Sequence, residues 1–69
     1  MYLVIEIQKN GNAISQIVTT HTELKEAEQT YHTILAAAAV SEVDVHSAVL
    51  MLYDGKVLKK ESYYHNGEA

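Results

Sequence analysis

The sequence predicts a single small α+β domain in which two β-hairpins flank one α-helix, in the order ββαββ. This fold class follows from two short turn signals, each between two segments that read as strands, and from one helical stripe of apolar residues between the hairpins. We expect the hairpins to form a single antiparallel sheet with the helix on one face. The chain of 69 residues has room for one domain, which we expect over residues 1–65, with a flexible tail at 66–69.

The first hairpin is predicted from alternation on both sides of an Asn-Gly pair. In residues 2–8 the odd-numbered positions are apolar and share one face, which is the pattern of a half-buried strand. An Asn-Gly pair at residues 10–11 is a strong signal for a two-residue turn. This turn predicts a return strand over residues 13–19, with Ile7 opposite Ile14.

The helix is predicted from apolar residues that recur with helical spacing. Thr20 and Glu23 fit a capping box at its start, and Thr22 alone could also serve as the N-cap. Four alanines at residues 36–39 favour helix and let another backbone approach closely, and the helix should end near residues 40–41. The apolar stripe consists of Leu24, Ala27, Tyr31, Ile34, Leu35 and Ala38.

The second hairpin is predicted around an Asp-Gly pair at residues 54–55. The pair joins a strand over residues 45–53 to a return strand over residues 56–64. This turn places Met51 opposite Leu58. The first of the two strands is apolar on both faces, whereas a strand with one face in water should alternate.

Apolar residues expected on the uncovered face of the sheet indicate self-association. One helix covers only one face of such a sheet, and Tyr2, Val4, Ile17 and Tyr64 are expected to join residues 45–53 on the other face. Domains below roughly 70–80 residues usually need a disulfide, a metal or a partner chain. We therefore expect a homo-oligomer, a dimer or higher, packed through the open sheet face or extended edge to edge.

Composition excludes several classes of function. Cysteine is absent, so neither disulfides nor thiolate metal sites are available. The net charge of −4 excludes the basic footprint of a protein that binds duplex nucleic acid. The longest apolar run, residues 34–40, is far shorter than the ~20 residues that span a bilayer, and no charged segment precedes an apolar stretch at the N-terminus. We expect a cytoplasmic protein with no membrane partner, no duplex nucleic acid partner and no signal peptide.

The candidate ligand-binding residues come from a basic and aromatic strand in an otherwise acidic chain. Lysines neutralise phosphate groups and tyrosine rings stack on bases. Strand alternation sends Lys59 and Tyr63 to one face, and it sends Lys60 and Tyr64 to the other. With His46, these residues could bind a small anionic ligand such as a nucleotide between copies of a homo-oligomer. The alternative is that the lysines only protect an edge strand from aggregation.

The sequence contains no recognisable catalytic motif or metal-ligand set. Asp44 and His46 share one side of a strand, but a zinc site needs a third ligand, such as His21 or His65. No serine lies in a Gly-x-Ser-x-Gly elbow, and Ser62 and His65 would point to opposite faces of a strand. We therefore expect a non-enzymatic protein with no cofactor and no bound metal.

Four segments of the chain together resemble a known group of proteins. They are the Val-Ile-Glu-Ile-Gln opening at residues 4–8, residues 27–41, residues 46–50 and residues 61–65. These segments resemble short phage and prophage proteins of Gram-positive gut bacteria, a family without an assigned activity, and the helical segment is the most specific part of the resemblance.

The resemblance implies a viral origin and action in the host cytoplasm, and it supplies no catalytic residues. It implies a phage accessory protein that counters host defence, either by sequestering a nucleotide-like host signal or by blocking a host protein. The alternative is a minor structural or assembly component of the phage particle.

Overall fold

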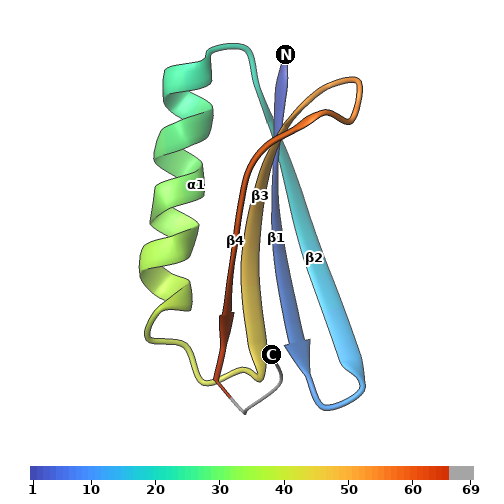
Figure 1. Cartoon of the computed structure of the whole chain (residues 1–69), viewed down its shortest axis with the longest axis vertical. Helices are drawn as coiled ribbons and strands as arrows, with labels where there is room; N and C mark the ends of the chain where they lie inside the picture. Colours follow the sequence, from blue (N-terminus) through green and yellow to red (C-terminus); the bar gives the residue numbers. More distant parts are fainter. Residues whose placement is uncertain (66–69) are drawn as a thin grey trace.

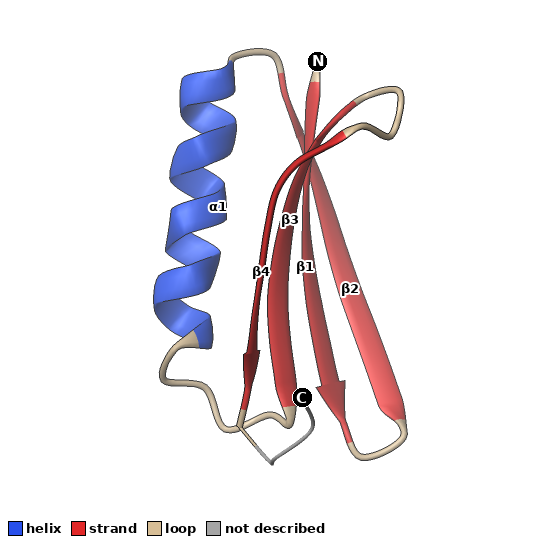
Figure 2. Cartoon of the chain, viewed as in Figure 1, coloured by secondary structure: helices blue, strands red, loops and turns tan. Residues whose placement is uncertain are grey.

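The computed structural model describes residues 1–65 as a four-stranded antiparallel sheet with one helix packed against it (Figures 1 and 2). The elements are β1 (Tyr2–Asn10), β2 (Ala13–His21), α1 (Leu24–Ala38), β3 (Val45–Leu52) and β4 (Val57–Tyr64). The strands lie in the order β2-β1-β3-β4. This architecture confirms the predicted ββαββ order and the α+β class. The flexible tail predicted for residues 66–69 lies outside the described residues.

The first hairpin turns one residue later than the sequence predicts. Asn10 pairs with Ala13, so Gly11 and Asn12 form the loop and the predicted turn at residues 10–11 is wrong. Gly11 has a φ of 64°, and no non-glycine residue among residues 1–65 has a positive φ. A type II′ turn needs a positive φ only at its first loop position, which glycine adopts without steric cost. Glycine therefore takes the first loop position, and Asn12 needs no strained backbone.

The later turn changes the partners in the first hairpin. Ile7 pairs with Gln16 rather than with Ile14, and Ile5 pairs with Val18. Each partner has moved by two residues, so every side chain keeps the face that alternation gives it. The polar Gln16 therefore lies on the same face as before, opposite Ile7, and Ile5 lies opposite an apolar residue.

The helix begins later than predicted because β2 extends farther than predicted. Thr20 lies in β2, and Glu23 rather than Thr22 is the N-cap residue, with no side-chain hydrogen bond to the helix. The predicted capping box and threonine cap are therefore wrong. The apolar stripe is confirmed on the side of α1 that packs on the sheet, where Ile34 and Leu35 are half-buried, whereas Leu24 at its start is 41% exposed. The buried helix residues are Ala27, Tyr31 and Ala38.

The second hairpin contains a β-bulge that the sequence does not predict. Met51 pairs with Val57, so the predicted pair of Met51 with Leu58 is wrong. The register shifts next to Leu50 because β4 has one extra residue there, Leu58. At the loop, Gly55 has a φ of 97° and its amide donates to the carbonyl of Leu52 over 2.9 Å.

The helix covers the side of the sheet that was expected to stay open. Val4 and Leu50 are fully buried and pack with Tyr31, with Tyr2 at the edge of this core. The prediction that Tyr2 and Val4 lie on the uncovered face is therefore wrong. Ile17 also lies on the helix side, because it pairs with Glu6.

The chain connection explains this choice of side. β2 and β3 are both antiparallel to β1, so they run parallel to each other and are joined through α1. Crossovers between parallel strands are right-handed in about 98% of cases. The connection, rather than the number of apolar residues on a face, thus selects the side on which the helix packs.

We call the uncovered side of the sheet the open face. Register places the odd-numbered residues of β1 and β3 and the even-numbered residues of β2 on it. Its large apolar residues include Leu3, Ile5, Ile7, Ile14, Val18, Val45, Val49, Met51 and Val57. Tyr64 also lies there, as predicted, because it pairs with Val45. Within residues 1–65, no helix has the length and apolar character needed to cross a bilayer.

Candidate functional site

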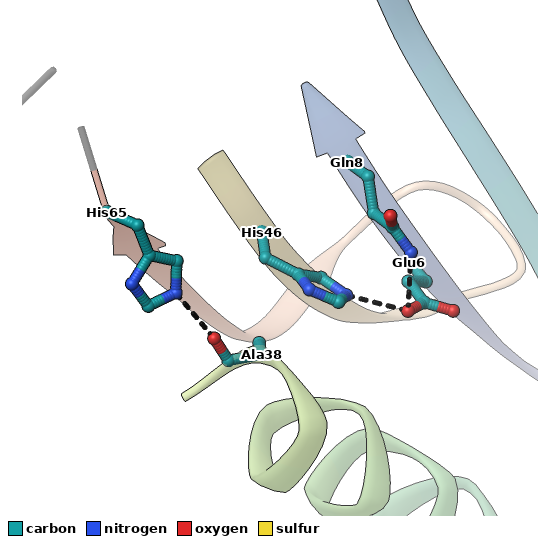
Figure 3. A network of polar contacts seen from close by, with 5 residues as sticks. All are labelled: Glu6, Gln8, Ala38, His46 and His65. Carbon is teal, nitrogen blue, oxygen red and sulfur yellow. Dashed lines mark hydrogen bonds and ion pairs between the residues drawn. The ribbon is translucent and has the colours of Figure 1, made fainter. Parts of the chain in front are cut away.

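Polar side chains gather beneath the C-terminal end of α1, on the covered side of the sheet (Figure 3). β1 supplies Glu6 and Gln8, and β3 supplies His46, which is the direct cross-strand partner of Gln8. His65 follows β4 and approaches from the other side. We call these residues the polar cluster. β1 and β3, the first strands of the two hairpins, are neighbours at the centre of the sheet, which is why residues 40 positions apart in the chain meet here.

His46 is bonded on one side of its ring only. Its Nε2 lies 2.7 Å from Oε2 of Glu6, and Nε2 of Gln8 donates to the same carboxylate oxygen over 3.2 Å. The side chain is buried, with 4% of its surface exposed, and Nδ1 has no hydrogen-bond partner within residues 1–65. In the Nε2-protonated tautomer His46 donates to Glu6, and Nδ1 is a buried acceptor. The pair therefore fixes β1 against β3 at this end of the sheet.

His65 ties the end of the described chain to the end of the helix. Its Nε2 lies 2.6 Å from the carbonyl oxygen of Ala38, where the carbonyls of α1 lack helical partners. Its ring stacks on Tyr63, with centroids 6.1 Å apart and planes inclined by 7°. Its amide donates to the carbonyl of Asp44 over 2.8 Å. His65 thus links β4, α1 and the segment before β3.

The polar cluster offers a histidine and a carboxylate in hydrogen-bond contact, which is a possible proton-transfer pair. Within residues 1–65, no three or more His, Asp and Glu side chains lie close enough together to hold a metal ion. The same part of the chain contains no pocket. Asp44 and His46, which the sequence predicts on one side of a strand, bind different partners. Asp44 accepts a hydrogen bond from the amide of Gly11 over 2.8 Å, whereas His46 binds Glu6.

The five predicted ligand-binding residues are divided between the two sides of the sheet. His46 and Tyr63 pair with each other on the covered side, and Lys59 lies on that side as the partner of Leu50. Lys60 and Tyr64 lie on the open face. The alternation that the sequence predicts for these four β4 residues is therefore present, and one chain does not gather the five residues into a single strip.

Lys59 is already engaged by the helix. Its Nζ donates to Oε2 of Glu28 over 2.8 Å, and this hydrogen bond and the lysine charge lower the pKa of the Glu28 carboxyl. Tyr31 lies nearby in the core, where burial, together with the charge of Glu61, raises the pKa of its hydroxyl. On the covered side, the ion pair between Lys59 and Glu28 thus links β4 to α1.

The open face is the larger candidate surface. No element of residues 1–65 covers it, and Ile14 and Val18 have 67% and 53% of their surfaces exposed. Leu3, Ile5 and Ile7 are half-buried by their neighbours on the sheet. The face is therefore broad and apolar, without the recess that would enclose a small ligand.

Sequence reasoning missed Glu6 and Gln8 as members of a site. The available signal was that these polar residues follow Val4 on one side of an apolar strand, and that His46 occupies the matching side of another strand. Compared with protein-family models, curated proteins and solved structures, the chain gives no significant match. The functional argument therefore rests on the geometry described above.

Proposed function

We propose that the chain is a non-enzymatic binding protein that engages another protein through the open face. The observation that carries this proposal is that the more apolar side of the sheet is the side without a helix. Leu3, Ile5 and Ile7 line the open face, whereas Glu6 and His46 lie beneath the helix. Contiguous apolar patches of this kind mark interaction sites in soluble proteins.

The size of the open face fits a protein partner better than a small molecule. Strands lie about 4.8 Å apart and rise about 3.3 Å per residue, so the face measures about 500 Å² in projection. Specific protein interfaces bury at least about 1,000 Å² over both partners. If a protein partner covers the whole face, the area buried over both partners reaches that range. The face lacks the concavity by which small-molecule sites enclose their ligands.

The resemblance to short phage proteins supplies the biological setting of the proposal. In that setting the protein acts in the cytoplasm of an infected Gram-positive bacterium, as a homo-oligomer, and blocks an apolar surface of a host protein. The nucleotide-sequestering alternative is less well supported, since Lys59 is bonded to Glu28 and His46 is buried.

The test is native mass spectrometry of the tagged protein, purified gently from a Gram-positive host bacterium, with three variants. We expect a complex of fixed stoichiometry with one host protein. Ile5→Lys, at the centre of the open face, should abolish the complex, and the milder Ile5→Thr should weaken it. Val40→Lys should retain the complex, because Val40 is 82% exposed and lies outside both faces of the sheet.

Three outcomes would overturn the proposal. The first is an anionic adduct of a few hundred daltons that both lysine variants retain, which would favour nucleotide sequestration. The second is the presence of the protein in purified phage particles, which would favour a structural role. The third is a host complex that Ile5→Lys leaves intact while circular dichroism shows that the variant is folded.

A further inference from the structure

The two edge strands of the sheet differ in their protection against pairing with other strands. β2 and β4 lie at the edges. β4 carries Lys59, Lys60 and Glu61 and contains the bulge at Leu58. Charged side chains and bulges are the usual means by which edge strands avoid pairing. β2 has nine residues in unbroken register with β1 and contains no Asp, Glu, Lys or Arg.

β2 meets solvent on both faces as well as along its edge. Its residues are exposed throughout except for His21 at the end. Ile17 points to the covered side of the sheet but is 58% exposed, because α1 packs mainly against β3 and β1. Figure 1 shows β2 as the strand farthest from α1. Ile14 and Val18 are exposed on the open face. A long, uncharged and apolar edge strand of this kind is a template for another strand.

The backbone of β2 dictates which residues can bind such a strand. In an antiparallel ladder the hydrogen-bonded pairs alternate, beginning with the pair that flanks a two-residue loop, here Asn10 and Ala13. The odd-numbered residues of β2 therefore direct their backbone groups to β1. The even-numbered residues, from Ile14 to Thr20, direct theirs to the free edge.

We infer that β2 pairs antiparallel with β2 of a second copy of this chain, about a two-fold axis that passes beside Ile17. Ile17 is the central residue of the strand. This register sets Ile17 opposite Ile17 of the second copy, Gln16 opposite Val18, and Ile14 opposite Thr20. Each even-numbered residue meets an even-numbered residue, so the outward hydrogen-bonding groups match and both faces stay continuous.

The pairing closes after two copies. It uses the unprotected edge of each chain and leaves the charged β4 strands, with Lys59 and Lys60, at the two ends of the joined sheet. The two helices lie on one side, away from the new strand pair, and the two open faces form one continuous apolar surface. The inference thus deepens the proposed homo-oligomer and leaves the proposed binding surface exposed.

Charge exchange at the two-fold axis tests the inference in solution. In sedimentation velocity we expect the wild-type chain to have the mass of a dimer, and Ile17→Lys and Ile17→Glu each to lose it, because like charges then face each other. An equimolar mixture of the two variants should restore the dimer. A monomeric wild-type chain, dimeric single variants or a mixture that stays monomeric would each overturn the inference.

A single cysteine tests the register, because the chain has none of its own. Residues in a non-hydrogen-bonded antiparallel pair have Cα atoms about 4.5 Å apart, which is within the range for a disulfide. Ile17→Cys should therefore oxidise to a covalent dimer. Ile14→Cys is the control: Ile14 lies on the same strand and is 67% exposed against 58% for Ile17, but it faces Thr20 of the second copy, so it should form much less covalent dimer. Equal yields from the two variants would overturn the register.

One further variant separates the inference from the proposed function. Ile5→Lys alters the open face and leaves the edge of β2 unchanged. We expect it to abolish host-protein binding while its mass remains that of a dimer. Loss of the dimer in Ile5→Lys, with the fold intact, would mean that copies meet through the open face and would overturn the edge pairing.

Discussion

The two faces of the sheet differ in both composition and cover. The covered face combines small residues such as Ala48 with polar residues such as Glu6 and His46, and α1 packs closely on it through Ala27. The open face carries larger apolar side chains, such as Ile5, and has no layer above it within residues 1–65. The helix therefore packs on the face that its connections to β2 and β3 dictate. The face with more apolar side chains is left for other contacts.

The largest expected effect comes from two adjacent residues of β3 that point to opposite faces. Leu50 is fully buried under the helix, whereas Met51 lies on the open face. Leu50→Ala should lower the free energy of unfolding by about 3 kcal/mol, because it leaves a cavity in a small core. Met51→Ala should cost about 1 kcal/mol or less, because Met51 is only half-buried on the open face. Urea unfolding at one fixed protein concentration measures both.

Equal losses of unfolding free energy from the two substitutions would contradict the difference between the two faces. They would mean that Met51 is buried as fully as Leu50, and thus that a second chain covers the open face in the purified protein. The fixed protein concentration matters because the apparent stability of an oligomer depends on it.

The elements were predictable because each has a strong local signal. Alternation marks β1, helical spacing marks α1, and Gly11 and Gly55 mark the loops. The covered face was not predictable from the same pattern. Leu3, Ile5 and Ile7 form the more apolar side of β1, but the crossover from β2 to β3 places the helix over Val4. The handedness of this crossover depends on the whole β2-α1-β3 unit, so the residue pattern of a single strand does not predict it.

The second comparison concerns hydrogen bonding on the covered face. Glu6→Ala removes the acceptor of His46 and of Gln8 and leaves a buried imidazole without a partner. We expect a loss of about 1–3 kcal/mol in the free energy of unfolding. Glu6→Gln keeps an acceptor and should cost less. Urea unfolding tests these values, with Glu42→Ala as the control at an exposed position.

A loss from Glu6→Ala no larger than that from Glu42→Ala would show that the polar cluster contributes nothing to the packing of β1 against β3. The sequence marks His46 as a candidate ligand-binding residue and does not predict its contact with Glu6. Its true neighbour, Glu6, is set by the pairing of β1 with β3, which alternation alone does not specify. In β4, by contrast, alternation alone predicted the two faces of the candidate residues, and the pairing with β3 confirms that division.

The smallest expected effect is a change in the pKa of Glu28, which should differ between substitutions of the two adjacent lysines of β4. Lys59 on the covered side donates to Glu28, whereas Lys60 lies on the open face. Lys59→Ala should raise the pKa of the Glu28 carboxyl towards its ordinary value, and Lys60→Ala should leave that pKa unchanged. Titration of the Glu28 side-chain carboxyl by nuclear magnetic resonance measures this pKa in each protein.

The sign of the pH dependence follows from the direction of this shift. Because the pKa of Glu28 is lower in the folded chain than in the unfolded chain, its ion pair with Lys59 stabilises the fold above the unfolded-state pKa. That stabilisation is lost as the pH falls through the folded-state pKa. The pair is exposed to solvent, so its effect on unfolding should be small and weaker in high salt. Equal pKa changes in the two lysine variants would show that overall charge, rather than the face on which each lysine lies, governs Glu28.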